Sequence, residues 1–149
     1  MIALIQRVSE ASVSIDKEKK AIISKGLLVL LGIAPEDTGG DVEWLTRKII
    51  NLRIFNDMDG VMNRSCIDVD GELLVISQFT LHASTKKGNR PSYIYAAKPE
   101  IAIPLYESFL SKLKESVPNT FSGEFGADMQ VQLINDGPVT IHIDSRNKK

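Results

Sequence analysis

The segment SQFTLHAS, residues 77–84, places hydroxyl side chains and a histidine at the end of an apolar run. A chain that turns out of a sheet commonly exposes backbone N–H groups, and such groups can stabilise the oxyanion that develops during acyl transfer. The alternative is that Ser77 and Thr80 hydrogen-bond to the backbone around them at a strand end. Spacing alone leaves both interpretations open.

The two histidines of the chain do not complete a serine hydrolase. A serine nucleophile requires an adjacent base, and that base requires a third group to orient it. His82 follows Thr80 closely and His142 lies in TIHID, but neither forms a recognisable triad with an acidic partner. We therefore expect His82 to be a loop residue and His142 to be a half-exposed strand residue.

Lys86, Lys87 and Arg90 surround a glycine in TKKGNRPS. Such a loop suits a phosphate group or the end of an RNA strand, although loops of this composition are usually just solvated. The glycine spacing of a nucleotide-binding phosphate loop is absent. With 18 basic and 19 acidic residues, the chain has a net charge of −1 and no overall positive field for a long nucleic acid. Any contact with RNA should be local.

We expect no metal and no cofactor. The segments DMDG and DVDG resemble fragments of calcium loops, but neither continues to the terminal liganding glutamate. Cys66 is the single cysteine, which excludes an internal disulfide and a cysteine-based zinc site. We interpret Cys66 as a packing residue.

Gly137 and Pro138 interrupt an otherwise apolar stretch in NDGPVTIHID. Proline removes a backbone donor and glycine weakens a strand interior, so the pair predicts an edge, a bulge or a sharp turn. The residues themselves do not distinguish ordinary turn chemistry from a functional site.

Hydrophobic periodicity predicts a single, strand-rich, mixed α/β domain over residues 1–149, with two principal helices. Three or four strands are expected before residue 34, among them residues 2–8, 11–15 and 27–33, and further strands at residues 72–79, 129–135 and 139–143. The expected helices are about residues 42–52 and 104–116. The strand at residues 27–33 is apolar almost throughout, which indicates burial on both faces of a sheet. The N-terminus lacks the pattern of a signal peptide, and the longest apolar run is too short to span a bilayer. We therefore expect a cytoplasmic protein with no membrane contact.

Six segments together resemble the D-aminoacyl-tRNA deacylase family, from residue 1 to about residue 143. They are MIALIQRV, RIFND, SQFTL, KGNRPS, ADMQV and NDGPVT. SQFTL and GPVT are the two signature motifs of that family, and both occur here unaltered and in the expected order. Their pairing is specific, whereas either motif alone would be a weak signal.

The resemblance implies a small α/β domain with a curved, largely antiparallel sheet that dimerises through the sheet, with two equivalent active sites at the subunit interface. It implies hydrolysis of the ester that joins a D-amino acid to the 3′-terminal ribose of tRNA, and acceptance of glycyl-tRNA. The implied partners are the 3′ end of D-aminoacyl-tRNA and a second copy of the chain.

Carried over by position, the resemblance assigns Ser77, Gln78, Phe79 and Thr80 to the catalytic pocket. Backbone N–H groups near Phe79 and Thr80 would hold the ester carbonyl. With the neighbouring ribose hydroxyl assisting, no side-chain nucleophile would be required. Thr80 as the nucleophile stays open as an alternative.

The resemblance also matches Gly137 and Pro138 to a Gly-cisPro element that reaches into the other subunit's pocket. There its carbonyls would hold the α-ammonium group and leave no room for an L side chain, with Arg7 bracing the element. Lys86, Lys87 and Arg90 are candidate tRNA contacts. Two alternative functions remain: a non-catalytic module that binds RNA ends, and a general serine esterase that depends on Ser77.

Overall fold

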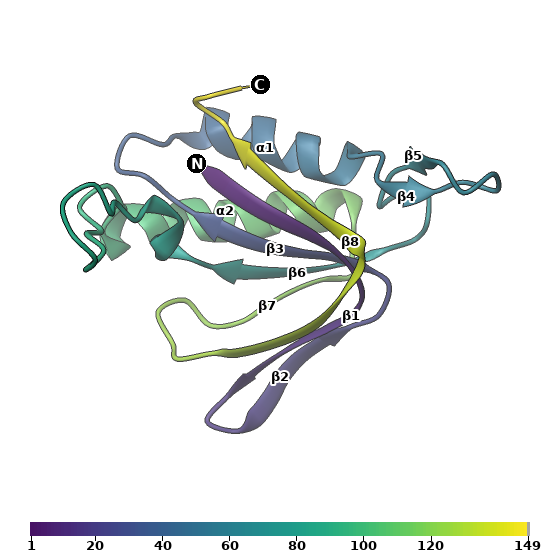
Figure 1. The fold of residues 1–149 in the computed structure, drawn as a ribbon, viewed down its shortest axis with the longest axis horizontal. Coiled ribbons are helices and arrows are strands. Elements are labelled where there is room, and N and C mark those ends of the chain that lie inside the picture. The colour runs from purple at the N-terminus through teal and green to yellow at the C-terminus, as the bar shows by residue number, and fades with distance from the viewer. Residues whose placement is uncertain (149) are drawn as a thin grey trace.

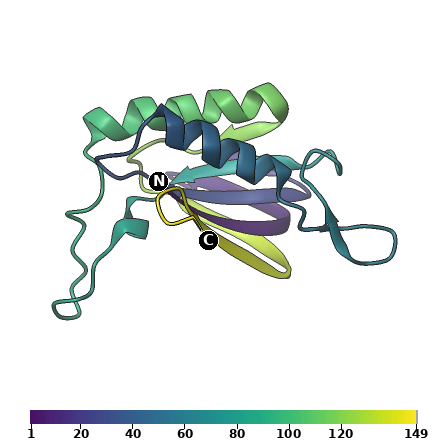
Figure 2. The ribbon, with the colours of Figure 1, turned by 90° about the horizontal axis from the view of Figure 1, so that it is seen from above.

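Two helices pack side by side on one face of a six-stranded sheet in the computed structural model, which describes residues 1–148 (Figure 1; Figure 2). The strands are β1 (Ile2–Ile15), β2 (Glu18–Ile23), β3 (Gly26–Gly32), β4 (Phe55–Asn56), β5 (Met62–Arg64), β6 (Glu72–Ser77), β7 (Thr120–Ser122) and β8 (Gln130–Asp144). The helices are α1 (Gly39–Asn51), α2 (Pro99–Ser116) and the short 3-10 helix η1 (Phe79–His82). The expected mixed α/β fold with two principal helices is confirmed.

The long strand β1 organises the sheet. β3 and then β2 pair antiparallel along one edge of β1, and β8 pairs antiparallel along the other edge. β6 and β7 continue the sheet beyond β3 in the parallel direction, while β4 and β5 form a separate hairpin. In Figure 1 the far halves of β1 and β8 curve away from the helix layer together with β2.

The prediction of two separate strands was wrong at both ends of the chain. Residues 2–15 form one strand, and β8 likewise runs as one strand through the Gly-Pro pair. The reason lies in the pairing: Asn135 lies opposite Val8 and Thr140 lies opposite Gln6, so residues 136–139 bulge out opposite Arg7 alone. Because β1 continues past the bulge, β8 resumes its pairing on the other side.

The boundaries of α2 and β6 also differ from the sequence prediction. α2 begins at Pro99 instead of residue 104, and Pro104 lies inside the helix. A proline in the first turn loses only an N–H that the helix would not use, so either proline was an acceptable start. β6 ends at Ser77 instead of residue 79 because the chain turns into η1.

No helix in residues 1–148 combines the length and apolarity that a membrane span requires.

Both faces of β3 and β6 are covered, as the apolar run predicted. Leu27 and Leu73 belong to the large cluster beneath the two helices. Leu28 and Leu74 point to the opposite face, where residues of β1, β2 and β8 cover them. The residues that follow β3 and β6 are therefore attached to strands that are buried on both faces.

A buried ion pair fixes the start of β1. The ammonium group of Met1 lies 2.6 Å from Asp37 Oδ1, and both side chains are fully buried. The same ammonium donates to Ser145 Oγ, which in turn donates to Asp41 Oδ1 at 2.6 Å. Burial raises the pKa of Asp41, but hydrogen bonds from Ser145 and Thr38 outweigh it and hold that pKa below its ordinary value. The network joins β1, the start of α1 and the end of β8.

Candidate active site

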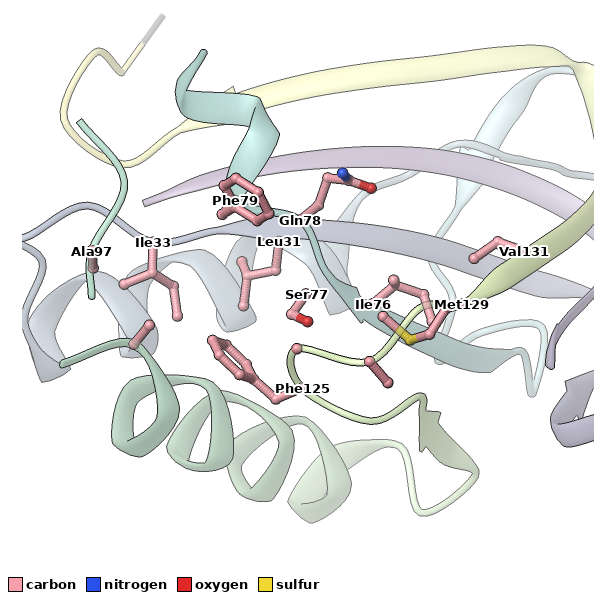
Figure 3. Close-up of a pocket in the computed structure, with 13 residues that line it drawn as sticks. Leu31, Ile33, Ile76, Ser77, Gln78, Phe79, Ala97, Phe125, Met129 and Val131 are labelled. Carbon is pink, nitrogen blue, oxygen red and sulfur yellow. The ribbon is translucent and has the colours of Figure 1, made fainter. Parts of the chain in front are cut away.

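A cavity of about 250 Å³ lies where β6 ends, and Ser77, Gln78 and Phe79 line it together (Figure 3). The complete lining is Leu31, Ile33, Ile76, Ser77, Gln78, Phe79, Ala97, Ala102, Phe125, Gly126, Ala127, Met129 and Val131. Figure 3 shows Ser77, Leu31 and Phe125 pointing toward one another. The cavity lining is mainly apolar, and its polar side chains, Ser77 and Gln78, lie where β6 leaves the sheet.

The turn out of β6 is held against β3. Just past the end of β6, the Gln78 N–H donates to the Leu31 carbonyl at 2.7 Å, and η1 begins at the next residue. Gly32 allows this close approach, because a Cβ there would lie 3.0 Å from Leu81 Cβ and 3.1 Å from the Gln78 carbonyl oxygen. The expected polar cluster is therefore presented by a short helix packed on β3.

Thr80 lies beside the cavity and does not line it. Its Oγ1 accepts a hydrogen bond from Gln78 Nε2, so these two side chains bond to each other. His82 Nε2 is buried and has no hydrogen-bond partner among the described residues, and His142 lies at a different cleft beside Trp44. In the part of the chain that the structure describes, neither histidine is paired with Ser77 or Thr80 as a base.

Cys66 offers no alternative nucleophile. It is fully buried in the cluster under the helices, and burial raises the pKa of its thiol to about 12. The reactive thiolate is therefore essentially absent near neutral pH. Its interpretation as a packing residue is confirmed.

The wall of the cavity formed by Phe125 was missed by the sequence analysis. The Phe125 ring packs against Tyr106, with 5.6 Å between ring centroids. Tyr106 donates its hydroxyl to the Val75 carbonyl at 3.0 Å, and burial raises its pKa to about 12, so it stays a neutral donor. No local signal marked Phe125, because its position depends on the packing of α2 against β6.

Arg7 ties the bulge of β8 to two other segments. Its side chain is buried, and Nε donates to the Asp136 carbonyl at 2.9 Å. Nη1 donates to the Ile54 carbonyl at 2.6 Å and to Asn56 Oδ1 at 3.3 Å. The peptide bond between Gly137 and the following proline is cis. Arg7 thus contacts the bulge directly.

Asn135 closes the base of the same bulge, and sequence analysis did not single it out. Its Oδ1 accepts the Val139 N–H at 2.8 Å, and its Nδ2 donates to the Val139 carbonyl at 3.3 Å and to Thr140 Oγ1 at 3.1 Å. The side-chain amide therefore takes the place of a backbone partner across the loop. The tendency of asparagine to bond to nearby backbone was the available signal.

The structure does not bring the bulge and the cavity together within one chain. Ser77 lies beside Leu31, whereas Arg7 lies opposite Leu27, so the two motifs sit toward opposite ends of β3. Neither Gly137 nor its proline lines the cavity. In Figure 1 the bend of β8 is on the right, and the turn that follows β6 is on the left.

The basic loop lies at the cavity end of the sheet. Lys86, Lys87 and Arg90 are all exposed. Ser84 and Ser92 close the loop by exchanging backbone hydrogen bonds of 2.8 and 2.9 Å. Just beyond the loop, the Tyr93 ring packs against Phe79, which lines the cavity. The three cations therefore lie on the segment that leads away from the cavity.

Comparisons with known proteins give one consistent family. The model of the D-Tyr-tRNA(Tyr) deacylase family matches residues 4–144. A D-aminoacyl-tRNA deacylase of Cytophaga hutchinsonii is 62% identical and one of Bacteroides fragilis is 60% identical, each over 100% of both chains.

Solved structures agree on the fold. A structure described as the c-Myc DNA unwinding element binding protein has a TM-score of 0.92 and 44% identity, and the match covers 97% of this chain and 98% of that one. A probable eukaryotic D-amino acid tRNA deacylase has a TM-score of 0.83 over 95% of this chain and 97% of that one, at 13% identity, which establishes the shared fold alone. From the family model and the full-length relatives, the chain belongs to the D-Tyr-tRNA(Tyr) deacylase family.

Proposed function

We propose that this protein hydrolyses the ester between a D-amino acid and the 3′-terminal ribose of tRNA, and spares the L-aminoacyl ester. The observation that carries the proposal is the cavity at the end of β6, lined by Ser77, Gln78 and Phe79 of the SQFTL motif. Family membership supplies the reaction class, and full-length relatives named D-aminoacyl-tRNA deacylase support it.

The backbone at the start of η1 is the proposed oxyanion site. The first N–H groups of a helix have no partner within the helix, which leaves those of Phe79 and Thr80 for a ligand. Held there, the ester carbonyl would gain negative charge as water attacks, and the tRNA ribose would leave as the alcohol. We favour assistance by the neighbouring ribose hydroxyl over attack by Thr80, because the Thr80 hydroxyl bonds Gln78 and lies outside the cavity lining.

Gly137 and Pro138 are the proposed chiral selector. Their carbonyls would bind the α-ammonium group of the substrate and occupy the space that an L side chain needs. A pocket rejects an isomer strongly through a clash or an unpaired buried group, whereas one methylene of apolar contact contributes only about 1–3 kcal/mol. Selection by backbone alone would also reject L isomers without reading which side chain is present, and glycyl-tRNA would pass.

The selector of one chain would act in the cavity of another. The separation of the bulge from the cavity along β3 supports a homodimer in which each copy supplies its bulge to its partner. Because aminoacyl-tRNA is used in translation, we also propose that the enzyme acts in the cytoplasm. The apolar cavity would hold the part of the substrate that never varies, the terminal nucleoside, since an enzyme for many D-amino acids cannot rely on a fitted side-chain pocket.

The decisive assay compares the two stereoisomers. Purified protein should release tyrosine from D-tyrosyl-tRNA and leave L-tyrosyl-tRNA intact, with a rate ratio of up to about 10⁴. Ester remaining after timed incubation is measured by acid precipitation of labelled aminoacyl-tRNA. Equal hydrolysis of both esters, or of neither, would contradict the proposed function.

Two sets of variants in the same assay separate the alternatives. The exposed cations favour a second candidate, a non-catalytic module for RNA ends, which predicts retention of tRNA without turnover. Charge reversal at Lys86, Lys87 and Arg90 should raise KM and leave kcat nearly unchanged if these residues only bind the substrate. Replacing Ser77 with alanine should leave most of the activity, whereas a general serine esterase would lose all of it.

Removing the Asn135 amide should weaken selection. We expect Asn135→Ala to lower stability by about 1–3 kcal/mol and to reduce the ratio of D to L hydrolysis, because the base of the bulge loses its hydrogen bonds. Asn135→Asp keeps an acceptor for the Val139 N–H and should be intermediate. Gln132, exposed on the same strand, is the control, and Gln132→Ala should change neither quantity. An unchanged ratio in Asn135→Ala would refute this role.

A further inference from the structure

Three exposed aromatic residues flank the basic loop: Phe79 precedes it, and Tyr93 and Tyr95 follow it. The rings of Phe79 and Tyr93 meet edge to face, with 5.0 Å between centroids. Phe79 is 55% exposed, Tyr93 39% and Tyr95 59%, so much of each ring remains accessible. We call these three residues the aromatic surface. Large rings left this open on a polar segment are typical of a binding site.

The segment that carries the aromatic surface, residues 79–97, contributes to the cavity lining at both of its ends. Phe79 itself lines the cavity, and so does Ala97 at the far end of the segment. The Ala97 N–H donates to the Ile33 carbonyl of the cavity wall at 2.8 Å, and the Ala96 N–H donates to the Tyr93 carbonyl at 3.0 Å. These bonds hold the turn that carries the two tyrosines. A chain-like ligand leaving the cavity would therefore pass over the rings.

The charge of this segment indicates an anionic occupant. Residues 79–98 contain Lys86, Lys87, Arg90 and Lys98 and no acidic residue, although the whole chain has a net charge of −1. In Figure 2 the loop between η1 and α2, coloured teal to green, extends away from the helices. Protein interfaces are depleted in lysine at their cores, whereas single-stranded nucleic acids are bound by cations interleaved with aromatic rings.

We propose that the aromatic surface stacks the unpaired bases that precede the terminal nucleotide of the tRNA 3′ end. This inference rests on the proposed function, because the terminal nucleoside must occupy the cavity for its neighbours to reach the rings. Base stacking on aromatic side chains tolerates any base and requires an unpaired strand. The basic loop then meets the phosphates of the same strand, and the enzyme reads a single-stranded end without reading its sequence.

The test uses two minimal substrates. One is D-tyrosyl-adenosine, which carries the terminal nucleoside alone, and the other is the D-tyrosyl ester of the trinucleotide cytidylyl-cytidylyl-adenosine. For the native enzyme, kcat/KM for the trinucleotide ester should exceed that for the nucleoside ester by roughly 5- to 150-fold for each stacked base. The gain should appear mainly in KM, since stacking binds the ground state and the transition state alike.

Variants of the two tyrosines should remove this gain. Tyr93→Leu and Tyr95→Leu should each lower the trinucleotide preference by roughly 5-fold or more and leave hydrolysis of D-tyrosyl-adenosine unchanged. Tyr93→Phe and Tyr95→Phe keep the ring and should retain the preference. Ile94 is 74% exposed in the same turn, so Ile94→Ala is a matched control for loss of apolar surface and should also retain it.

Each outcome separates this inference from the proposed function. If the native enzyme cleaves neither minimal substrate nor D-tyrosyl-tRNA, the proposed function is wrong, and the inference falls with it. If it cleaves both minimal substrates but the leucine variants keep the full trinucleotide preference, the stacking role is wrong and the function stands. A loss on both substrates together with a halved molecular mass would assign the rings to contact between copies of the chain, and would equally overturn stacking.

Discussion

Replacing Arg7 with alanine should lower the free energy of unfolding by about 3 kcal/mol and lower kcat/KM for D-tyrosyl-tRNA by at least roughly tenfold. The stability loss follows because the Asp136 and Ile54 carbonyls lose a charged donor inside the protein. The kinetic loss follows because the bulge that carries Gly137 loses its link to β1. Urea denaturation measures the first effect, and the isomer assay measures the second.

Two further variants identify the cause. Arg7→Lys keeps the charge but lacks the planar fork that serves two carbonyls at once, so it should fall between Arg7→Ala and the native protein. Arg53 is an exposed arginine that donates to the Asn63 carbonyl at 2.8 Å, and Arg53→Ala should change stability by less than about 0.5 kcal/mol. If Arg7→Ala unfolds more easily but keeps native kcat/KM and isomer ratio, Arg7 serves only the fold.

Replacing Asp37 with alanine should lower the free energy of unfolding by about 3–5 kcal/mol. Met1 and Asp37 are both fully buried, and the Met1 ammonium lies 2.6 Å from Asp37 Oδ1. Removal of the carboxylate leaves the buried ammonium charge without its ion-pair partner. The Ala34 N–H, which donates to Asp37 Oδ2 at 2.7 Å, also loses its acceptor. Urea denaturation at neutral pH measures the difference.

Glu36 is the matched control for Asp37. It adjoins Asp37 in the sequence and contacts the same arginine, Arg146, but its ion pair is exposed. Exposed pairs contribute little, so Glu36→Ala should cost less than about 1 kcal/mol. Equal effects of the two substitutions would show that the buried ammonium does not depend on Asp37.

The apolar patterns predicted most of the secondary structure because they report burial, which is a local consequence of side-chain type. The run at residues 27–33 indicated a strand covered on both faces, and β3 is such a strand. The three- and four-residue spacing at Val42, Leu45 and Ile49 indicated α1, and all three are buried. The start of α2 was misplaced because a helix that begins at Pro99 and a helix that begins at Pro104 leave similar local signals.

The short strands escaped prediction for a related reason. β7 covers only Thr120–Ser122, and its strand character comes from pairing with Leu73 and its neighbours on β6. Three residues carry too little periodicity to distinguish a strand from a loop. Whether such a short segment forms a strand depends on pairing with residues that are distant in the sequence.

The sequence by itself determined the family and indicated the residues of the candidate site, since SQFTL and GPVT are contiguous motifs. It also indicated that Arg7 belongs to a strand, because apolar and polar residues alternate around it, and that the Gly-Pro pair interrupts a regular strand. Only the tertiary structure decided which residues share a space. Phe125 and Met129 reach the cavity beside Ser77, Asn135 closes the bulge, and the bulge lies away from its own chain's cavity. These facts follow from strand register and helix packing, which join residues that no local pattern connects.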